Sequence, residues 1–122
     1  MRTVEGWDGM TERRLAGGDP LAEPETEFTV SSAEPAPGCA RLHCTGEIDE
    51  ATAPRLGAAI RAARPGHQLI EVDLHDVTFL DSSAMNTLVR HRSDDYRLVL
   101  VRVPAHIRRL FEITGLADIF LA

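Results

Sequence analysis

Strand-like and helix-like segments alternate along most of this chain, and this alternation restricts the folds that it can adopt. Two apolar runs of strand length, 68–74 and 97–103, are each followed by apolar residues spaced three or four positions apart, over 81–92 and 107–114. A further segment with helical spacing, 51–64, precedes the first of these strands. Strands that alternate with helices in this way favour an α/β fold with a largely parallel sheet.

The start of the domain has a different pattern. Residues 27–32 and 41–45 alternate polar and apolar side chains, and the segment 35–38 between them is typical of a turn. These pieces predict a hairpin, and we expect one more short strand over 117–122. The whole pattern predicts a single α/β domain over 27–122, with a mixed, mostly parallel sheet of four to five strands covered by about three helices.

The acidity of the chain is concentrated in front of this domain. Residues 1–34 contain eight acidic residues and three arginines, whereas residues 35–122 contain eleven and ten. Residues 1–26 also carry few hydrophobic side chains, too few to offset the entropy lost on ordering. We therefore expect residues 1–26 to form an acidic, disordered tail and the domain itself to be nearly neutral.

Several classes of protein are disfavoured by the same composition. No apolar run approaches the roughly 20 residues of a membrane span. Glu5, Asp8 and Glu12 interrupt any secretory signal, so we expect a cytoplasmic protein. A formal charge of −6 without a basic cluster argues against binding to nucleic acid or to an anionic membrane surface.

Metal or disulfide chemistry is not expected either. Cys39 and Cys44 lack the Cys-x-x-Cys spacing of metal and redox sites, and Cys44 fits a small core residue better. Glu71, Asp73 and His75 alternate along one strand and resemble a set of metal ligands, but a solvated strand end explains them more simply. We therefore expect no cofactor and no metal.

The segment 73–88, with the sequence DLHDVTFLDSSAMNTL, carries the most informative chemistry. A strand ends here, a short connection contains Phe79 and Leu80, and Asp81 and Ser82 open a helix. Asp and Ser are favoured N-cap residues, so a cap by itself explains this pattern. A hydroxyl in the first turn also lies near unpaired N–H groups and the positive end of the helix dipole, so the fold would tolerate a phosphate there.

Three segments in order resemble the STAS family, the anti-sigma factor antagonists of bacteria. Residues 73–88 resemble its DLS-x-V-x-F-hydrophobic-DSSGLG signature. Residues 46–55 (GEIDEATAPR) resemble its GELD-x-x-TAP-x segment, and residues 111–120 (FEITGLADIF) resemble its F-x-x-TGL-x-x-hydrophobic-F segment. Three motifs in the right order are far more specific than any one of them.

This resemblance implies a regulatory binding module without catalysis of its own. In that family the unphosphorylated protein binds an anti-sigma factor that is also a serine kinase, which frees the sigma factor. Phosphorylation of one serine abolishes the complex, and a metal-dependent phosphatase resets it. The serine after the motif aspartate is Ser82, which is the implied phosphoacceptor, with Ser83 as its competitor. The implied partner-binding residues are Asp81, Ser83, Glu47, Asp49, Ala84, Met85 and Asn86.

The chain departs from the family pattern at two places. Ala84, Met85 and Asn86 replace the glycine-containing GLG, so we expect side chains on a helix surface that glycine usually leaves bare. The chain also ends without the amphipathic C-terminal helix of the family. We therefore expect one side of the sheet to be uncovered, or covered by a partner or a second copy of the chain.

Three other functions can be compared with the sequence. A hydrolase using Ser82 or Ser83 as nucleophile would need a GxSxG elbow, which is absent. A phospho-aspartate receiver pairing Asp73 with Asp81 would need a second acidic pair near the first strand and a late lysine, and the chain has no lysine. The serious alternative is a STAS module that is not phosphorylated and acts as a scaffold or ligand sensor in a larger signalling assembly.

Overall fold

A computed structural model describes residues 27–121 of the chain, and the acidic segment 1–26 lies outside these described residues. The described part contains four strands and four helices, in an order that begins with a hairpin. In chain order the elements are β1 (Thr29–Ala36), β2 (Cys39–Ile48), α1 (Ala53–Ala63), β3 (Leu69–Leu80), α2 (Ser82–Arg90), β4 (Arg97–Val101), α3 (Ala105–Ile113) and α4 (Ala117–Phe120).

The strands form one sheet in the order β1-β2-β3-β4. The β1–β2 pair is antiparallel, and the β2–β3 and β3–β4 pairs are parallel. Pro37 and Gly38 make the hairpin turn, where Gly38 adopts a φ of 80° that side chains disfavour. The predicted hairpin and the mixed, mostly parallel sheet are both confirmed.

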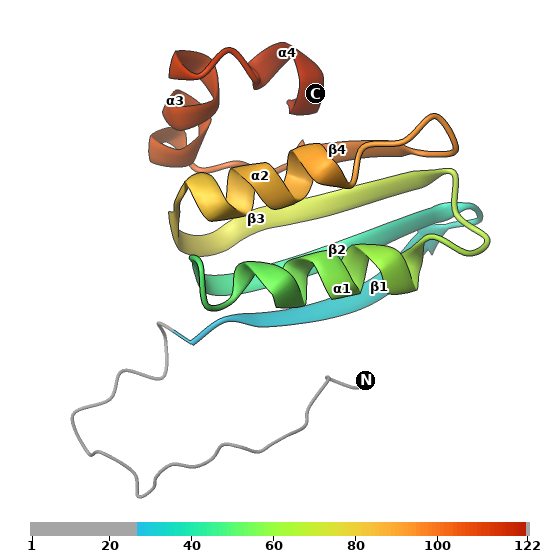
Figure 1. Cartoon of the computed structure of the whole chain (residues 1–122). Helices are drawn as coiled ribbons and strands as arrows, with labels where there is room; N and C mark the ends of the chain where they lie inside the picture. Colours follow the sequence, from blue (N-terminus) through green and yellow to red (C-terminus); the bar gives the residue numbers. More distant parts are fainter. Residues whose placement is uncertain (1–26, 122) are drawn as a thin grey trace, which may run out of the picture.

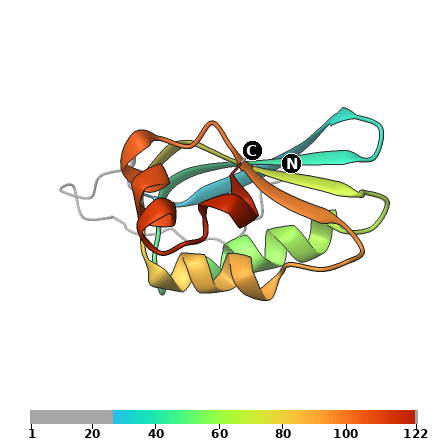
Figure 2. The ribbon, with the colours of Figure 1, turned by 90° about the horizontal axis from the view of Figure 1, so that it is seen from above.

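The helices are distributed unequally around the sheet. Helices α1 and α2 lie together on one face, whereas α3 and α4 lie at the β4 side, with α3 at the end where the parallel strands finish (Figures 1 and 2). The opposite face is free of helices within residues 27–121, and we call it the open face. One uncovered side was expected from the sequence.

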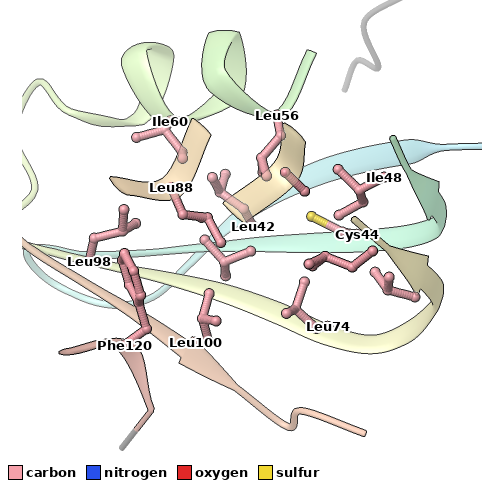
Figure 3. Close-up of a cluster of buried hydrophobic side chains, with 14 of the residues drawn as sticks. Leu42, Cys44, Ile48, Leu56, Ile60, Leu74, Leu88, Leu98, Leu100 and Phe120 are labelled. Atoms are coloured by element: carbon pink, nitrogen blue, oxygen red, sulfur yellow. The ribbon is translucent and has the colours of Figure 1, made fainter. Parts of the chain in front are cut away.

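The core fills the space between the sheet and helices α1 and α2. Alternate residues of the strands point into it, so Leu42 and Cys44 of β2 meet Leu56 of α1 and Leu88 of α2 (Figure 3). Each buried Leu or Ile side chain contributes about 1.5–3 kcal/mol to stability. The expectation that Cys44 is a core residue is confirmed, and burial raises the pKa of its thiol to about 12.

Strand β3 is longer than the sequence pattern indicated. The prediction ended it at residue 74 and placed Phe79 and Leu80 in a connection, but the strand continues to Leu80 and only Asp81 separates it from α2. The reason is pairing: β2 runs alongside as far as the Ile48–Leu80 pair, and it absorbs two register shifts on the way. Polar residues in this stretch therefore interrupted the apolar pattern without ending the strand.

The C-terminal segment is also different from the expected strand. Residues Ala117–Phe120 form the short helix α4, and of this segment Leu121 alone makes a bridge, to Leu100 of β4. The ring of Phe120 packs edge-on against Phe111 at a centroid distance of 6.0 Å. This contact explains the difference, because a helical turn carries Phe120 into the core beside α3.

Candidate functional site

The ends of β2 and β3 bring two of the sequence motifs together. The strands are parallel and their last pairs are Glu47 with Phe79 and Ile48 with Leu80, so the segments that follow both strands start at the same edge of the sheet. The backbone N–H of Asp81 donates to the carbonyl oxygen of Ile48 over 3.2 Å and ties the two segments together. Such edges, at the carboxyl ends of parallel strands, are where α/β folds place their binding residues.

Helix α2 begins at this edge, and Asp81 is its N-cap. The Asp81 carboxylate accepts hydrogen bonds from the backbone N–H groups of Ser83 (2.9 Å) and Ala84 (3.3 Å). The predicted cap is thus confirmed, but two N–H groups that a phosphate could have used are already paired. Ser82, the first residue of the helix, is exposed, whereas Ser83 is half-buried.

The loop between β2 and α1 is closed by Asp49 and Thr52. Asp49 Oδ1 accepts from the backbone N–H groups of Ala51 (3.0 Å) and Thr52 (3.1 Å), so Asp49 acts as a turn residue. The Thr52 hydroxyl lies 2.9 Å from the carbonyl oxygen of Glu47. It therefore binds back into the loop and does not cap α1 through its side chain, although Thr52 occupies the N-cap position.

Gly46, which opens the first motif, has a backbone role. Its φ is 87°, and a Cβ atom at this position would lie 2.0 Å from the carbonyl oxygen of Glu27. Only glycine allows the segment before β1 to pass this close to β2. The glycine of the GEID sequence thus shapes the approach to the loop, and the loop in turn presents Glu47 and Asp49.

Two of the three residues that stand at the GLG positions of the family are not on the surface. Ala84 is fully buried and Met85 nearly so, whereas Asn86 is exposed. The expectation that all three add side chains to the helix surface is therefore wrong for Ala84 and Met85, because these positions face the core. The apolar spacing over 81–92 predicts that Val89 faces the core together with Met85 and Leu88, but Val89 is 42% exposed and Thr87 is buried in its place. The buried face of α2 is rotated by part of a turn from the predicted one.

Phe79 is a site residue that the sequence prediction missed. Its side chain is 47% exposed directly before the Leu80–Asp81 junction, and it pairs across the sheet with Glu47. The signal was present in the sequence, because alternation places Phe79 on the opposite face from the buried Leu80. The expectation that Phe79 belongs to a connection ignores this alternation.

Asp73, the aspartate that opens the motif segment 73–88, holds the turn after β4. Its carboxylate binds Arg102 through Nε (3.1 Å) and Nη2 (3.0 Å) and accepts from the N–H of His75 (3.0 Å). Burial raises the pKa of the Asp73 carboxyl, but the Arg102 and His75 hydrogen bonds outweigh it, and the pKa lies below its ordinary value. Arg102 adopts a φ of 52°, so this pair is formed from a strained backbone position.

The acidic residues along β3 are thus explained by pairing inside the fold. Glu71 forms an ion pair with Arg41 at 2.7 Å, and Asp73 is bound to Arg102. Within residues 27–121 no three His, Cys, Asp or Glu side chains are grouped so that they could hold a metal ion. None of the helices in that range has the length and apolar character needed to cross a membrane.

Comparison with known proteins identifies relatives of this chain. A family model described as "Mlab, STAS domain" matches residues 31–122. An anti-sigma-B factor antagonist of Listeria monocytogenes is 36% identical over 85 residues, which cover 64% of this chain and 73% of the relative. One from Staphylococcus aureus is 37% identical over 79 residues, with coverages of 61% and 73%.

Solved structures agree with this assignment. An anti-sigma factor antagonist from Mycobacterium paratuberculosis superposes with a TM-score of 0.70 at 28% identity, covering 83% of this chain and 89% of the other. The antagonist SpoIIAA in its unphosphorylated form has a TM-score of 0.63 at 19% identity, with coverages of 76% and 87%, and shares the fold. The chain belongs to the STAS-domain family, and its relatives are anti-sigma factor antagonists.

Proposed function

We propose that this protein is an anti-sigma factor antagonist whose unphosphorylated form binds an anti-sigma factor that is also a serine kinase, and that phosphorylation of Ser82 ends the complex. The observation that carries the proposal is the position of Ser82. It is exposed as the first residue of α2, between the Asp81 cap and a half-buried Ser83, at the edge where two family motifs meet. A kinase can therefore reach the Ser82 hydroxyl without unfolding the helix.

The switch acts through charge and bulk. A phosphoserine adds about −1.5 to −2 charges at neutral pH. On Ser82 these charges would lie beside the Asp81 carboxylate, which already occupies the N–H groups of Ser83 and Ala84. The phosphate would thus remain largely uncompensated, and burying an unpaired charge in an interface is costly. The fold stays intact while the partner surface becomes unsuitable.

The remaining roles follow from the same surface. Asp81, Ser83, Glu47, Asp49 and Asn86 would contact the partner, with Asp49 acting chiefly through the loop that it closes. Ala84 and Met85 would act only by packing beneath that surface, since both are buried. A metal-dependent phosphatase would restore the free hydroxyl. The protein itself would perform no catalysis, and it would act in the cytoplasm, where ATP and the sigma factor are found.

The phosphorylation step is tested directly. The full chain is incubated with ATP and each purified serine-kinase anti-sigma factor encoded in the same genome, and the modified residue is mapped by mass spectrometry. We expect phosphate on Ser82, none on the Ser82→Ala variant, and unchanged labelling of Ser83→Ala. Labelling that persists in Ser82→Ala and is lost in Ser83→Ala would assign the role to Ser83. Binding without any labelling would favour a scaffold that is not phosphorylated.

The charge switch is tested by affinity. Ser82→Asp should weaken binding to the anti-sigma factor by at least about tenfold, which corresponds to about 1.4 kcal/mol. Ser82→Asn is the matched control, because it has nearly the same size and no charge, and it should lose much less. Equal affinities of Ser82→Asp and the wild-type protein, measured by isothermal titration calorimetry, would contradict a switch based on charge.

A further inference from the structure

Large hydrophobic side chains are exposed at several places, and most of them lie at one end of the molecule. Isolated exposed apolar residues are normal and need no explanation, whereas a group of them marks an interaction surface. In the part of the chain that the structure describes, the exposed large hydrophobic residues are Phe79, Val89, Leu110, Ile113 and Ile119. Phe79 is the last but one residue of β3, and Leu110 and Ile113 belong to α3, so three of the five lie near the end that carries Ser82.

Helix α3 presents two of these residues on a single stripe. His106, Leu110 and Ile113 are spaced four and three residues apart, which places them on one side of the helix. His106 Nε2 lies 3.2 Å from the carbonyl oxygen of Thr78, the residue before Phe79. The stripe therefore faces the end of β3. Both ribbon views place α3 at this end, beside the start of α2 (Figures 1 and 2).

The stripe is separate from the contacts that hold α3 in the fold. Ile107 and Phe111 are completely buried and attach the helix to the core. Leu110 is 36% exposed and Ile113 is 70% exposed, and neither belongs to the core cluster. Burying an Ile or Leu side chain contributes about 1.5–3 kcal/mol, which this helix gains only when something covers the stripe.

Charge around the stripe differs from charge around Ser82. Arg108, Arg109 and Glu112 are exposed on α3, so its surface carries two positive charges against one negative charge, and neither arginine has an ion pair with an acidic residue in the range 27–121. The loop on the other side of Ser82 carries Glu47, Asp49 and Glu50 instead. A partner that covers the stripe should therefore present apolar side chains bordered by carboxylates, and the two charged borders would set its orientation.

We propose that Phe79, Leu110 and Ile113, named here the α3 patch, form the apolar half of the surface that binds the anti-sigma factor. This inference rests on the proposed function and extends its interface beyond the partner-binding residues that the family resemblance implies. The partner contributes apolar side chains with an acidic border that meets Arg109. The α3 patch supplies affinity, and Ser82, at the other half of the surface, supplies the switch.

The test compares apolar-to-serine variants that differ only in location. Leu110→Ser with Ile113→Ser, and separately Phe79→Ser, should each weaken binding of the anti-sigma factor selected in the kinase experiment by at least about tenfold. Val89→Ser on α2 and Ile119→Ser on α4 are the controls, since both residues are exposed and lie outside the α3 patch, and they should change affinity by less than about threefold. Circular dichroism and thermal melting confirm that each variant is folded.

A charge variant sharpens the same test. Arg109→Glu should weaken binding, and added salt should then lower the affinity less than it does for the wild-type protein. A partner without an acidic border would bind the variant and the wild-type protein equally well. Equal affinity of the Leu110→Ser, Ile113→Ser double variant and the wild-type protein would overturn the α3 patch.

The outcomes separate this inference from the proposed function. If no anti-sigma factor binds the wild-type chain, the proposed function fails and the patch with it. If Ser82→Asp abolishes binding and the patch variants bind normally, only the patch is overturned. If the wild-type chain is a dimer by light scattering and the patch variants are monomers with normal partner affinity, a second copy of the chain covers the patch, which also overturns the inference.

Discussion

The two faces of the sheet are built from the same strands, but apolar burial stabilises one face and polar side-chain pairs stabilise the other. On the face under α1 and α2, side chains such as Leu42 and Leu74 are almost completely buried. On the open face, side chains of neighbouring strands form pairs, Arg41 with Glu71 and His43 with Asp76. Asp73 pairs with Arg102, which directly follows β4. Because neighbouring residues of a strand point to opposite faces, each strand contributes to both arrangements.

The difference explains how the open face can remain without a helix. Its polar groups are satisfied by one another or by water, so burial is not required to stabilise it. Most of the stability should therefore come from the covered face, with Asp73 as the exception on the open face, since its carboxylate is only 4% exposed. The candidate functional site lies at the edge of the sheet where β2 and β3 end.

The largest expected effect is on the covered face. Leu88→Ala should lower the free energy of unfolding by about 2–5 kcal/mol, because it leaves a cavity between α2 and the sheet. Val89→Ala is the matched control one residue along the same helix, and it should cost less than about 1 kcal/mol, since Val89 is 42% exposed. Urea unfolding measures both, and equal losses would contradict the assigned face of α2.

Two cysteines report separately on the two faces. Cys44 is completely buried under the helices, with its thiol pKa raised to about 12, whereas Cys39 lies partly exposed on the open face. With a thiol reagent at pH 8, Cys44 should react more slowly than Cys39 by about 100-fold or more, because it requires opening of the core. The variants Cys39→Ser and Cys44→Ser assign the two rates, and similar rates would show that the helices cover the sheet only loosely.

The Asp73 pair should be the strongest interaction on the open face. Asp73→Asn should cost about 1–2 kcal/mol at neutral pH, because it removes a charged hydrogen-bond acceptor while Arg102 remains partly solvated. The folded-state pKa of Asp73 lies below its ordinary value of 3.8, so the stabilisation is present above that pH and is lost as the pH falls below it. The difference between wild type and variant, measured by denaturation from pH 7 to pH 2, should therefore shrink in acid. A constant difference would assign the loss to packing.

The smallest effect is expected for the exposed pair on the same face. His43 and Asp76 are 2.8 Å apart, but their side chains are 37% and 53% exposed. Asp76→Asn should therefore change stability by no more than about 1 kcal/mol, and any change should diminish with added salt. A loss as large as that of Asp73→Asn would mean that the open face is stabilised by its pairs as a connected network.

Much of the fold was predictable because it depends on local periodicity. The apolar spacing of Leu56, Ile60 and Ala63 predicted α1, and the structure ends that helix at Ala63, just before the expected residue 64. The cap at Asp81 was predictable for the same reason, since a carboxylate reaches the N–H groups two and three residues ahead of it. The exposed position of Ser82 followed from that cap together with the motif.

Errors arose wherever a contact between distant segments decided the outcome. Strand β3 continues to Leu80 because β2 lies beside it, and residues 117–120 form a helix because Phe120 packs on Phe111. Val89 is exposed and Ala84 buried because the position of α2 over the sheet selects which side of the helix is covered. The pairing of β2 with β3 joins residues as far apart as Ile48 and Leu80, and even the Phe111–Phe120 contact links two different helices, so the spacing of neighbouring apolar residues does not predict either of them.

The sequence by itself determined the order of strands and helices as far as α3, the capped start of α2 and the family motifs, since these depend on neighbours along the chain. Only the tertiary structure decided that Phe79 is exposed beside Glu47, that Asp73 is bound to Arg102, and that α3 lies next to the end of β3. The physical reason is that parallel strands return to the same edge only after a helix has crossed between them. Residues thirty positions apart thus become neighbours at the surface that carries Ser82.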